Sequence, residues 1–138
     1  ISSITYIIKY FRKISNDEYK YNEPYYGTIF NDEKKEKIKD ITGYMQGCDN
    51  EVVCISTDAW LYMIPLKQSN KEFDMLLLGN LGKDGEKGVI EKIKGFKGKK
   101  IILMNKEKNS WQESDKIIEF VENNFTKIGE IKDILIYQ

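Results

Sequence analysis

The sequence predicts an α/β fold, and three observations carry that prediction. Short apolar runs rich in β-branched residues, typical of buried strands, alternate with segments in which apolar residues recur at helical spacing. The strand-like runs are apolar at successive positions, as expected for a sheet covered by helices on both faces. With 138 residues, of which 41% are hydrophobic, the chain can bury one compact core. We therefore expect a single α/β domain over residues 28–138.

The residues before this domain differ in character from it. Residues 1–11 place apolar side chains at the spacing of one helix face, and residues 12–27 mix charged residues with tyrosines. We expect an N-terminal helix and a connecting arm over residues 1–27. The tyrosines either lie against the domain or form a platform for sugar rings or a membrane interface. Because the chain begins at Ile1 rather than Met, we expect it to be a piece of a longer protein.

The first half of the domain predicts two helices and a strand. Asn31 or Asp32 can cap a helix that Gly47 ends. The apolar residues expected on its core face are Ile38, Ile41 and Met45. A buried strand follows over 51–56, and a short helix over 59–64, capped by Thr57 or Asp58, ends before Pro65.

The second half continues the alternation. The apolar runs at 73–80 and 99–105 predict two more buried strands, and the periodicity over 110–125 predicts a helix. A further helix between these strands has its expected inward residues at Val89, Ile90, Ile93 and Phe96. The last residues form one strand or a hairpin that turns near Lys132 and Asp133. The order predicts a mostly parallel, Rossmann-like sheet of about four to five strands flanked by helices, in which the final strand can run antiparallel.

Composition excludes several classes of function. Lys and Arg together number 22, as do Asp and Glu, and Arg12 is the only arginine. This balance gives no electrostatic footprint for nucleic acid, and we expect no nucleic-acid partner. The chain has no histidine, which excludes a Ser-His-Asp triad and every histidine-based metal site. Cys48 and Cys54 are expected to be a loop thiol and a small buried residue rather than a disulfide. We expect no metal and no cofactor.

Small polar residues follow the predicted strands. Thr57 and Asp58 come after the first, Asn80 after the second and Asn105 after the third. Ligands of open parallel sheets bind beyond the carboxyl ends of the strands, so these residues are candidates for holding a hydroxyl-rich or phosphorylated ligand. The alternative is that Thr57 and Asp58 are ordinary helix caps and the asparagines ordinary turn residues.

A glycine cluster lies between a predicted strand and a predicted helix. Gly79, Gly82, Gly85 and Gly88 recur every third residue, which matches neither the dinucleotide nor the P-loop spacing. The pattern favours a flexible turn in which glycines adopt left-handed backbone angles.

The carboxylates predict no catalytic pair. Asp58 and Asp74 are expected at opposite ends of parallel strands, too far apart for glycoside hydrolysis. Trp111, with Gln112 and Glu113, can stack on a sugar ring and hydrogen-bond to it; the alternative is a partly buried residue at a helix start.

Three segments carry a resemblance to a known group of proteins. ISTDAWLYMIPL (55–66), FDMLLLGNLGKDGE (73–86) and GEIKDILIY (129–137) resemble the soluble C-terminal domain of bacterial multi-pass membrane proteins regarded as glycosyltransferases of cell-surface polysaccharide assembly. The resemblance covers about residues 25–138. It implies a location on the extracytoplasmic face of the bacterial cell membrane, with residues 1–27 including a juxtamembrane arm. It also implies two partners, the transmembrane part of the same polypeptide and a glycan or lipid-linked sugar, and it assigns no catalytic residue here.

Our first hypothesis is therefore a non-catalytic extracytoplasmic domain that assists acceptor binding in a membrane-embedded glycosyltransferase-like protein. Whether the parent is an enzyme stays open, and this fragment is not expected to catalyse a reaction alone. One alternative is a stand-alone enzyme or small-molecule binder that uses the strand-end pocket, with Asp58 as its base. Another is a protein-interaction module with an exposed patch at Trp60, Tyr62 and Met63.

Overall fold

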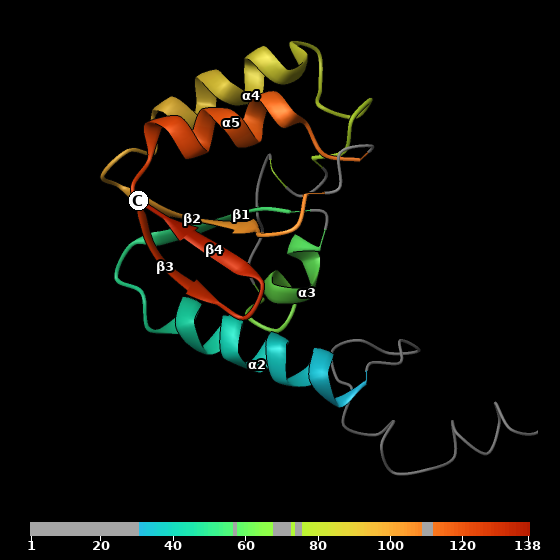
Figure 1. Cartoon of the computed structure of the whole chain (residues 1–138), viewed down its shortest axis with the longest axis vertical. Coiled ribbons are helices and arrows are strands. Elements are labelled where there is room, and N and C mark those ends of the chain that lie inside the picture. The colour runs from blue at the N-terminus through green and yellow to red at the C-terminus, as the bar shows by residue number, and fades with distance from the viewer. Residues whose placement is uncertain (1–30, 57, 68–72, 74–75, 109–111) are drawn as a thin grey trace, which may run out of the picture. The chain divides into compact units, whose positions relative to one another are not determined.

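A computed structural model describes residues 31–56, 58–67, 73, 76–108 and 112–138 (Figure 1). By its internal contacts the chain divides into two units, Ile1–Lys35 and Glu36–Gln138, and the sheet belongs to the second. The predicted helix and arm over residues 1–27 lie outside the described residues. The same holds for Thr57, Asp74 and Trp111.

The described helices and strands confirm a mixed α/β fold, although α3 is followed directly by α4 and β3 by β4, so the predicted strict alternation is not found. In chain order they are α2 (Asp32–Gln46), β1 (Glu51–Ile55), α3 (Ala59–Met63), α4 (Gly85–Lys94), β2 (Lys100–Asn105), α5 (Asp115–Asn124), β3 (Lys127–Ile131) and β4 (Ile134–Tyr137). Local signals explain the helix starts. The Lys34 amide donates to Asn31 Oδ1 at 2.8 Å, as a capping asparagine requires, and the Ile117 amide donates to Ser114 Oγ at 3.3 Å.

The sheet is mixed, with the strand order β1-β2-β4-β3. β1 and β2 are parallel, whereas β4 runs antiparallel to both β2 and β3. The prediction of a mostly parallel sheet is therefore wrong for the described strands, and the antiparallel final strand is confirmed. The reason is local. Two residues, Lys132 and Asp133, join β3 to β4, and a connection this short can only reverse the chain.

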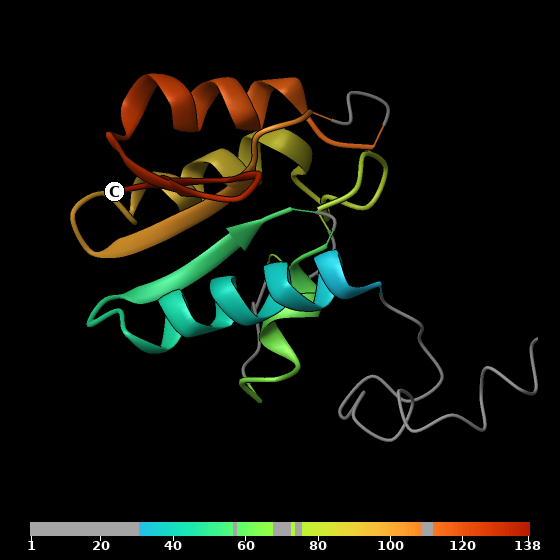
Figure 2. The same ribbon diagram turned by 60° about the horizontal axis from the view of Figure 1, so that its bottom comes forward.

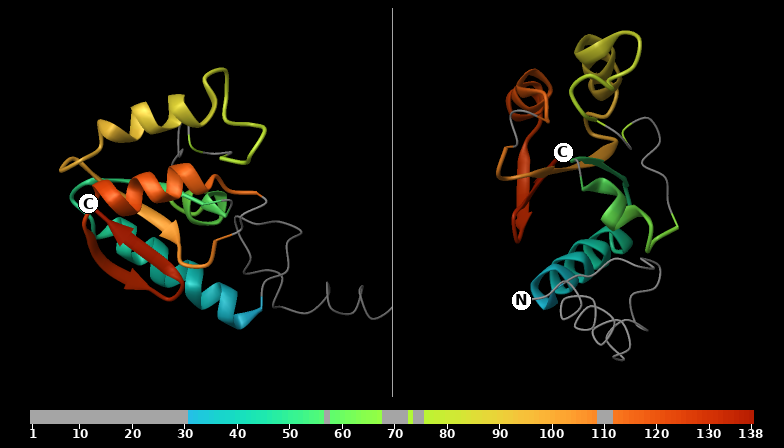
Figure 3. Two further views of the ribbon diagram at one scale, coloured as in Figure 1. Left: turned by 45° about the horizontal axis from the view of Figure 1, so that its top comes forward. Right: turned by 90° about the vertical axis from the view of Figure 1, so that its right-hand side faces the viewer.

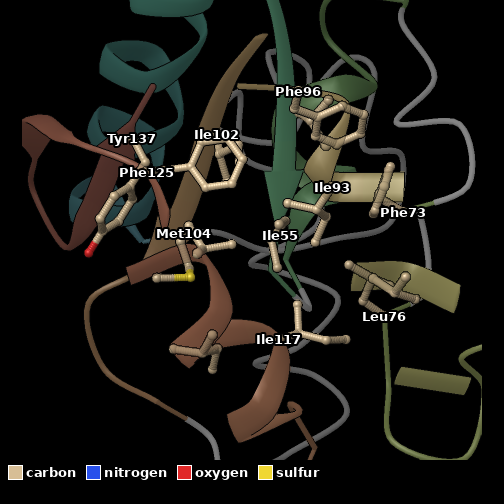
Figure 4. Packing of buried hydrophobic residues seen from close by; sticks show 14 of the residues in the cluster. Ile55, Phe73, Leu76, Ile93, Phe96, Ile102, Met104, Ile117, Phe125 and Tyr137 are labelled. Carbon is tan, nitrogen blue, oxygen red and sulfur yellow. The ribbon is translucent and has the colours of Figure 1, made fainter. Parts of the chain in front are cut away.

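The apolar run at 73–80 is not a strand in its described part. The Leu78 amide donates to the Gln112 carbonyl at 2.8 Å, and the Asn80 amide donates to the Leu77 carbonyl at 2.8 Å, which makes a tight turn. Phe73 and Leu76 nevertheless lie in the core beside Ile55 and Ile93 (Figure 4). Leu78, in contrast, is 43% exposed. Periodicity cannot distinguish a loop with buried apolar residues from a buried strand.

Helices cover the two faces of the sheet separately. α4 and α5 lie on one face, and α2 from Glu36 onward lies on the other together with α3 (Figures 1 and 2). Alternation along the strands divides the core accordingly: Val53 and Ile55 of β1 point toward α4 and α5, whereas Cys54 points toward α2. The further views in Figure 3 show the same layers.

The core under α4 and α5 is the larger of the two. Its buried members are Val53, Ile55, Phe73, Leu76, Val89, Ile93, Phe96, Ile102, Met104, Ile117, Ile118, Val121, Phe125, Leu135 and Tyr137. α2 contributes the three residues expected from its sequence, Ile38, Ile41 and Met45, all buried.

The glycine-rich connection before α4 has the predicted left-handed geometry. The φ angles of Gly79, Gly82 and Gly85 are 88°, 79° and 55°. Residues with a side chain rarely adopt such angles, so these glycines form a turn. Gly88 lies within α4 instead, where an added Cβ would stand 2.7 Å from the Asp84 Cβ.

The apolar patch proposed from the sequence is corrected. Tyr62 and Met63 are buried, because α3 turns them toward the sheet, whereas Trp60 and Ile64 are 42% and 41% exposed. Within the residues that the structure describes, no helix has the length and apolar character needed to cross a bilayer.

Candidate functional site

Polar side chains gather where β1 and β2 end. The chain leaves β1 at Ser56 and leaves β2 after Asn105, and the parallel register Ile55↔Met104 places both exits at one edge of the sheet. The loop at Leu78 joins the same neighbourhood through its hydrogen bond to Gln112. Three loops that are separate in sequence therefore meet at the carboxyl end of the parallel pair, where ligands of such sheets bind.

A buried carboxylate lies at this edge. Glu113 is 7% exposed, and its Oε1 accepts a long hydrogen bond of 3.4 Å from the Asn105 side-chain amide. An ionised carboxylate is costly to bury unless polar groups surround it, so Asn105 has a structural reason to face Glu113. A carboxylate beside an amide can accept and donate hydrogen bonds at adjacent points, a combination that suits hydroxyl groups.

Ser114, the next residue, links α5 to α4. Its hydroxyl caps α5 by accepting from the Ile117 amide, and it donates to Glu86 Oε1 at 2.5 Å. Lys116 Nζ stands 2.8 Å from the other Glu86 oxygen. The Lys116 ammonium, and after it the Ser114 hydroxyl, lower the pKa of Glu86, and Glu86 in turn raises the pKa of Lys116. Glu86 is thus held ionised by two partners.

A small cavity lies beneath these groups. Its volume is about 10 Å³, and its lining is Ile55, Ser56, Leu76, Glu113, Ser114, Ile117 and Ile118. That volume holds about one water molecule. Ser56 is also buried, and its Oγ accepts from the Asp58 amide at 3.1 Å. The cavity can therefore take a water or a single hydroxyl group, whereas a sugar ring would have to lie on the surface outside it.

The structure brings only some of the predicted site residues together. Asn105 lies at the strand end against Glu113. Asp58 is half-buried and occupies the N-cap position of α3, as the capping alternative predicts. Its carboxylate, however, accepts no capping hydrogen bond from the helix. Asn80 is exposed in the turn after Leu77. Thr57 and Trp111 lie outside the described residues.

Two residues of this cluster were missed by the sequence analysis. The capping role of Ser114 had a usable signal, because serine just before an apolar-periodic segment favours a helix start. Glu86 had none, since its partners Ser114 and Lys116 are 28 and 30 positions away.

Within the described part of the chain, no three His, Cys, Asp or Glu side chains converge as metal ligands. The arrangement thus offers hydrogen bonds from fixed polar groups. Comparison of the chain with family models, curated proteins and solved structures finds no match in any of the three.

Proposed function

We propose that this chain is a non-catalytic, extracytoplasmic domain of a membrane-embedded glycosyltransferase-like protein of cell-surface polysaccharide assembly. Its role is to contact the polysaccharide acceptor, or the lipid-linked sugar, at the carboxyl ends of β1 and β2. The sequence resemblance supports the proposal: its segment 55–66 begins at the end of β1, and its segment 73–86 contains the turn at Leu77–Asn80, both of which belong to the loops at this edge.

One observation carries the binding role. The strand edge presents fixed polar groups around a cavity of about 10 Å³, whereas pockets that enclose small molecules measure roughly 300–1,000 Å³. Among the described residues, a cavity of this size cannot enclose a sugar ring, so the edge suits contact with part of a polymer better than enclosure of a whole substrate. This favours an acceptor-positioning role over a stand-alone enzyme that uses Asp58 as its base.

We also propose that the relation to Rossmann-like folds is confined to the β1–β2 unit. Such folds repeat a parallel strand pair joined by a crossover helix. Here the connection from β1 to β2 contains α4 on one face of the sheet and α3 on the other (Figure 1), and the polar residues lie at the carboxyl end of the pair.

The membrane assignment has a direct test in the coding sequence upstream of Ile1. Several encoded apolar segments of about 20 residues would support it. A start codon immediately before Ile1 would contradict the membrane assignment and leave a free α/β protein, whose strand edge is then tested alone.

The binding role is tested by nuclear magnetic resonance with chitotriose and maltotriose as probes. We expect at least one to shift the signals of Ser56, Asn105 and Ser114 with a Kd of about 1 mM or weaker. Asn105→Ala should abolish the shifts. Asn124→Ala is the matched control, because Asn124 is an exposed asparagine whose side chain only donates to the Phe120 carbonyl within α5. Shifts that survive Asn105→Ala, or no shifts with either probe, contradict the site.

A second candidate function rests on a different surface. Trp60 and Ile64 are four positions apart at α3 and are both more than 40% exposed, which is typical of an interaction face. A protein-interaction module would show concentration-dependent association in analytical ultracentrifugation that Trp60→Ser removes. A monomer at every concentration would exclude self-association through this face.

A further inference from the structure

Charged side chains connect α2 to the β3–β4 turn, which is 96 residues away in the sequence. Lys37 Nζ lies 2.6 Å from Asp133 Oδ1 and donates to Oδ2 at 2.7 Å. Lys132 Nζ lies 3.3 Å from a Glu36 oxygen and 3.5 Å from an Asp40 oxygen. The turn residue Asp133 therefore pairs with a helix lysine, and the turn residue Lys132 pairs with two helix carboxylates. We call these five side chains the ionic clasp.

The turn uses a lysine where its backbone favours glycine. The φ angle of Lys132 is 55°, at the first position of a two-residue hairpin loop. Glycine adopts such an angle without cost, whereas lysine does not. A residue that breaks a local preference is expected to compensate elsewhere. Here the compensation is the pairing of the Lys132 ammonium with the carboxylates of Glu36 and Asp40 in α2. These two carboxylates, Glu36 above all, also raise the pKa of Lys132.

The turn is also held from the other side, by β2. The Lys106 amide donates to the Asp133 carbonyl at 2.8 Å, and Lys106 Nζ pairs with Glu130 of β3. If the clasp opens, the hairpin therefore keeps its place and the helix moves.

The clasp and most of the apolar contacts of α2 lie on successive stretches of the helix. Glu36, Lys37 and Asp40 carry the charges, and one of the three buried apolar residues of α2, Ile38, lies among them, whereas Ile41 and Met45 lie further along. The two carboxylates that Lys132 contacts, Glu36 and Asp40, are 67% and 42% exposed, so these ion pairs are weak and salt-sensitive. Lys37 is 20% exposed, so its pair with Asp133 is screened less by salt. The buried apolar side chains are not affected by salt in this way.

We infer that the ionic clasp is a releasable strap: it fixes α2 over Glu36–Asp40 to the β3–β4 turn and can open while the rest of α2 stays packed. This segment, with Ile38, then frays without unfolding the domain. The inference does not depend on the proposed function.

Hydrogen exchange of the backbone amides in α2 tests the strap. Lys132→Glu places a third negative charge beside Glu36 and Asp40, and we expect exchange at residues 36–40 to rise about fivefold to thirtyfold. Little change is expected at residues 45 and 46, whose amides donate to carbonyls beyond residue 40. Raising NaCl from about 0.02 M to 0.5 M should also speed exchange at residues 36–40 in the wild type, by a smaller factor. Glu36→Lys and Asp40→Lys added to Lys132→Glu should restore the protection.

Lys94→Glu is the matched control. It reverses a comparably exposed lysine in an ion pair with Glu91, within α4, and should leave exchange in α2 unchanged. Lys132→Gly separates charge from backbone strain, because it relieves the positive φ but removes the ammonium. It should stabilise the hairpin and still speed exchange at residues 36–40.

The strap is overturned if Lys132→Glu and Lys132→Gly both leave exchange at residues 36–40 within about twofold of the wild type. It is equally overturned if exchange rises uniformly along α2, because the helix then opens as one piece. Should Lys132→Glu fail to fold, Lys132→Gly and the salt series decide between these outcomes.

Discussion

The two faces of the sheet are covered in different ways. On one face α4 and α5 pack over a broad apolar cluster and are joined to each other through Glu86, Ser114 and Lys116. On the other face α2 buries three apolar residues and is fixed at one end by exposed ion pairs. Burial of apolar area gives a non-directional stabilisation that salt does not weaken, whereas exposed ion pairs are individually weak. This difference predicts that the α2 layer opens more readily than the α4–α5 layer.

The largest expected effect comes from deleting core volume under α4. Ile93 is fully buried in that cluster, and Ile93→Ala should cost about 2–5 kcal/mol of unfolding free energy through lost transfer energy and a cavity. Ile41 is equally buried on the α2 face. We expect Ile41→Ala to fall in the lower part of the same range, because α2 can settle toward the sheet. Urea unfolding measures both, and a larger loss for Ile41→Ala would reverse the comparison.

A smaller effect is expected at the junction of α4 and α5. Ser114→Ala removes the cap of α5 and the hydrogen bond to Glu86 from a buried position. We expect a loss of about 1–2 kcal/mol in unfolding free energy. Ser114→Asp, which retains a capping oxygen but places a charge beside Glu86, is the informative partner variant. If Ser114→Ala is neutral in urea unfolding, the junction contributes only packing.

The pH dependence at Glu86 should be smaller still. Lys116 and Ser114 lower its pKa in the folded state. The resulting stabilisation is therefore present above the ordinary carboxyl pKa and is lost as the pH falls through the lowered value. Thermal unfolding of Glu86→Gln should show a flatter decline in Tm over this acidic range than the wild type. Parallel curves for the two proteins would contradict a role for this ion pair.

The smallest effect is expected from an isolated surface pair. Lys94 and Glu91 interact within a single helix and are both more than half exposed. Lys94→Glu should change the unfolding free energy by no more than about 0.5 kcal/mol. A larger loss, measured by urea unfolding, would mean that exposed pairs count for more in this protein than the clasp argument allows.

The sequence was sufficient for features that arise from neighbouring residues. The inward face of α2 was predicted, as were three of the four left-handed glycines. The Asn31 cap and the hairpin at Lys132 and Asp133 were each one of two predicted alternatives. All of these depend on local geometry. The strand predicted at 73–80 failed for the opposite reason. Phe73 and Leu76 are buried by tertiary contacts, whereas Leu78 is exposed, and the described amides bond within a turn and to Gln112.

The candidate site was predictable only in part. Its location at the carboxyl ends of the parallel strands follows from a general rule, and Asn105 lies there. The burial of Glu113 and the link from Ser114 to Glu86 depend on loops meeting from distant parts of the chain. The periodicity and spacing of residues in the sequence carry no information on such tertiary contacts.

The two buried positions that best report the two faces are Cys54 and Val121. Cys54 lies on the α2 face and is fully buried, and burial raises its pKa to about 12. It therefore reacts with thiol reagents only when that face opens. Val121, also fully buried, lies on the inward face of α5 and belongs to the apolar cluster on the other face of the sheet.

The most direct test is the thiol-labelling rate at these two positions under native conditions. Cys48→Ser leaves Cys54 as the only thiol, and Cys48→Ser with Cys54→Ala and Val121→Cys moves that thiol to the other face. We predict that Cys54 is labelled about tenfold faster or more, because the whole α2 layer, in a larger and rarer opening than the fraying of residues 36–40, separates from the sheet without global unfolding. Equal rates at both positions, matching the rate of global unfolding, would contradict the difference between the faces.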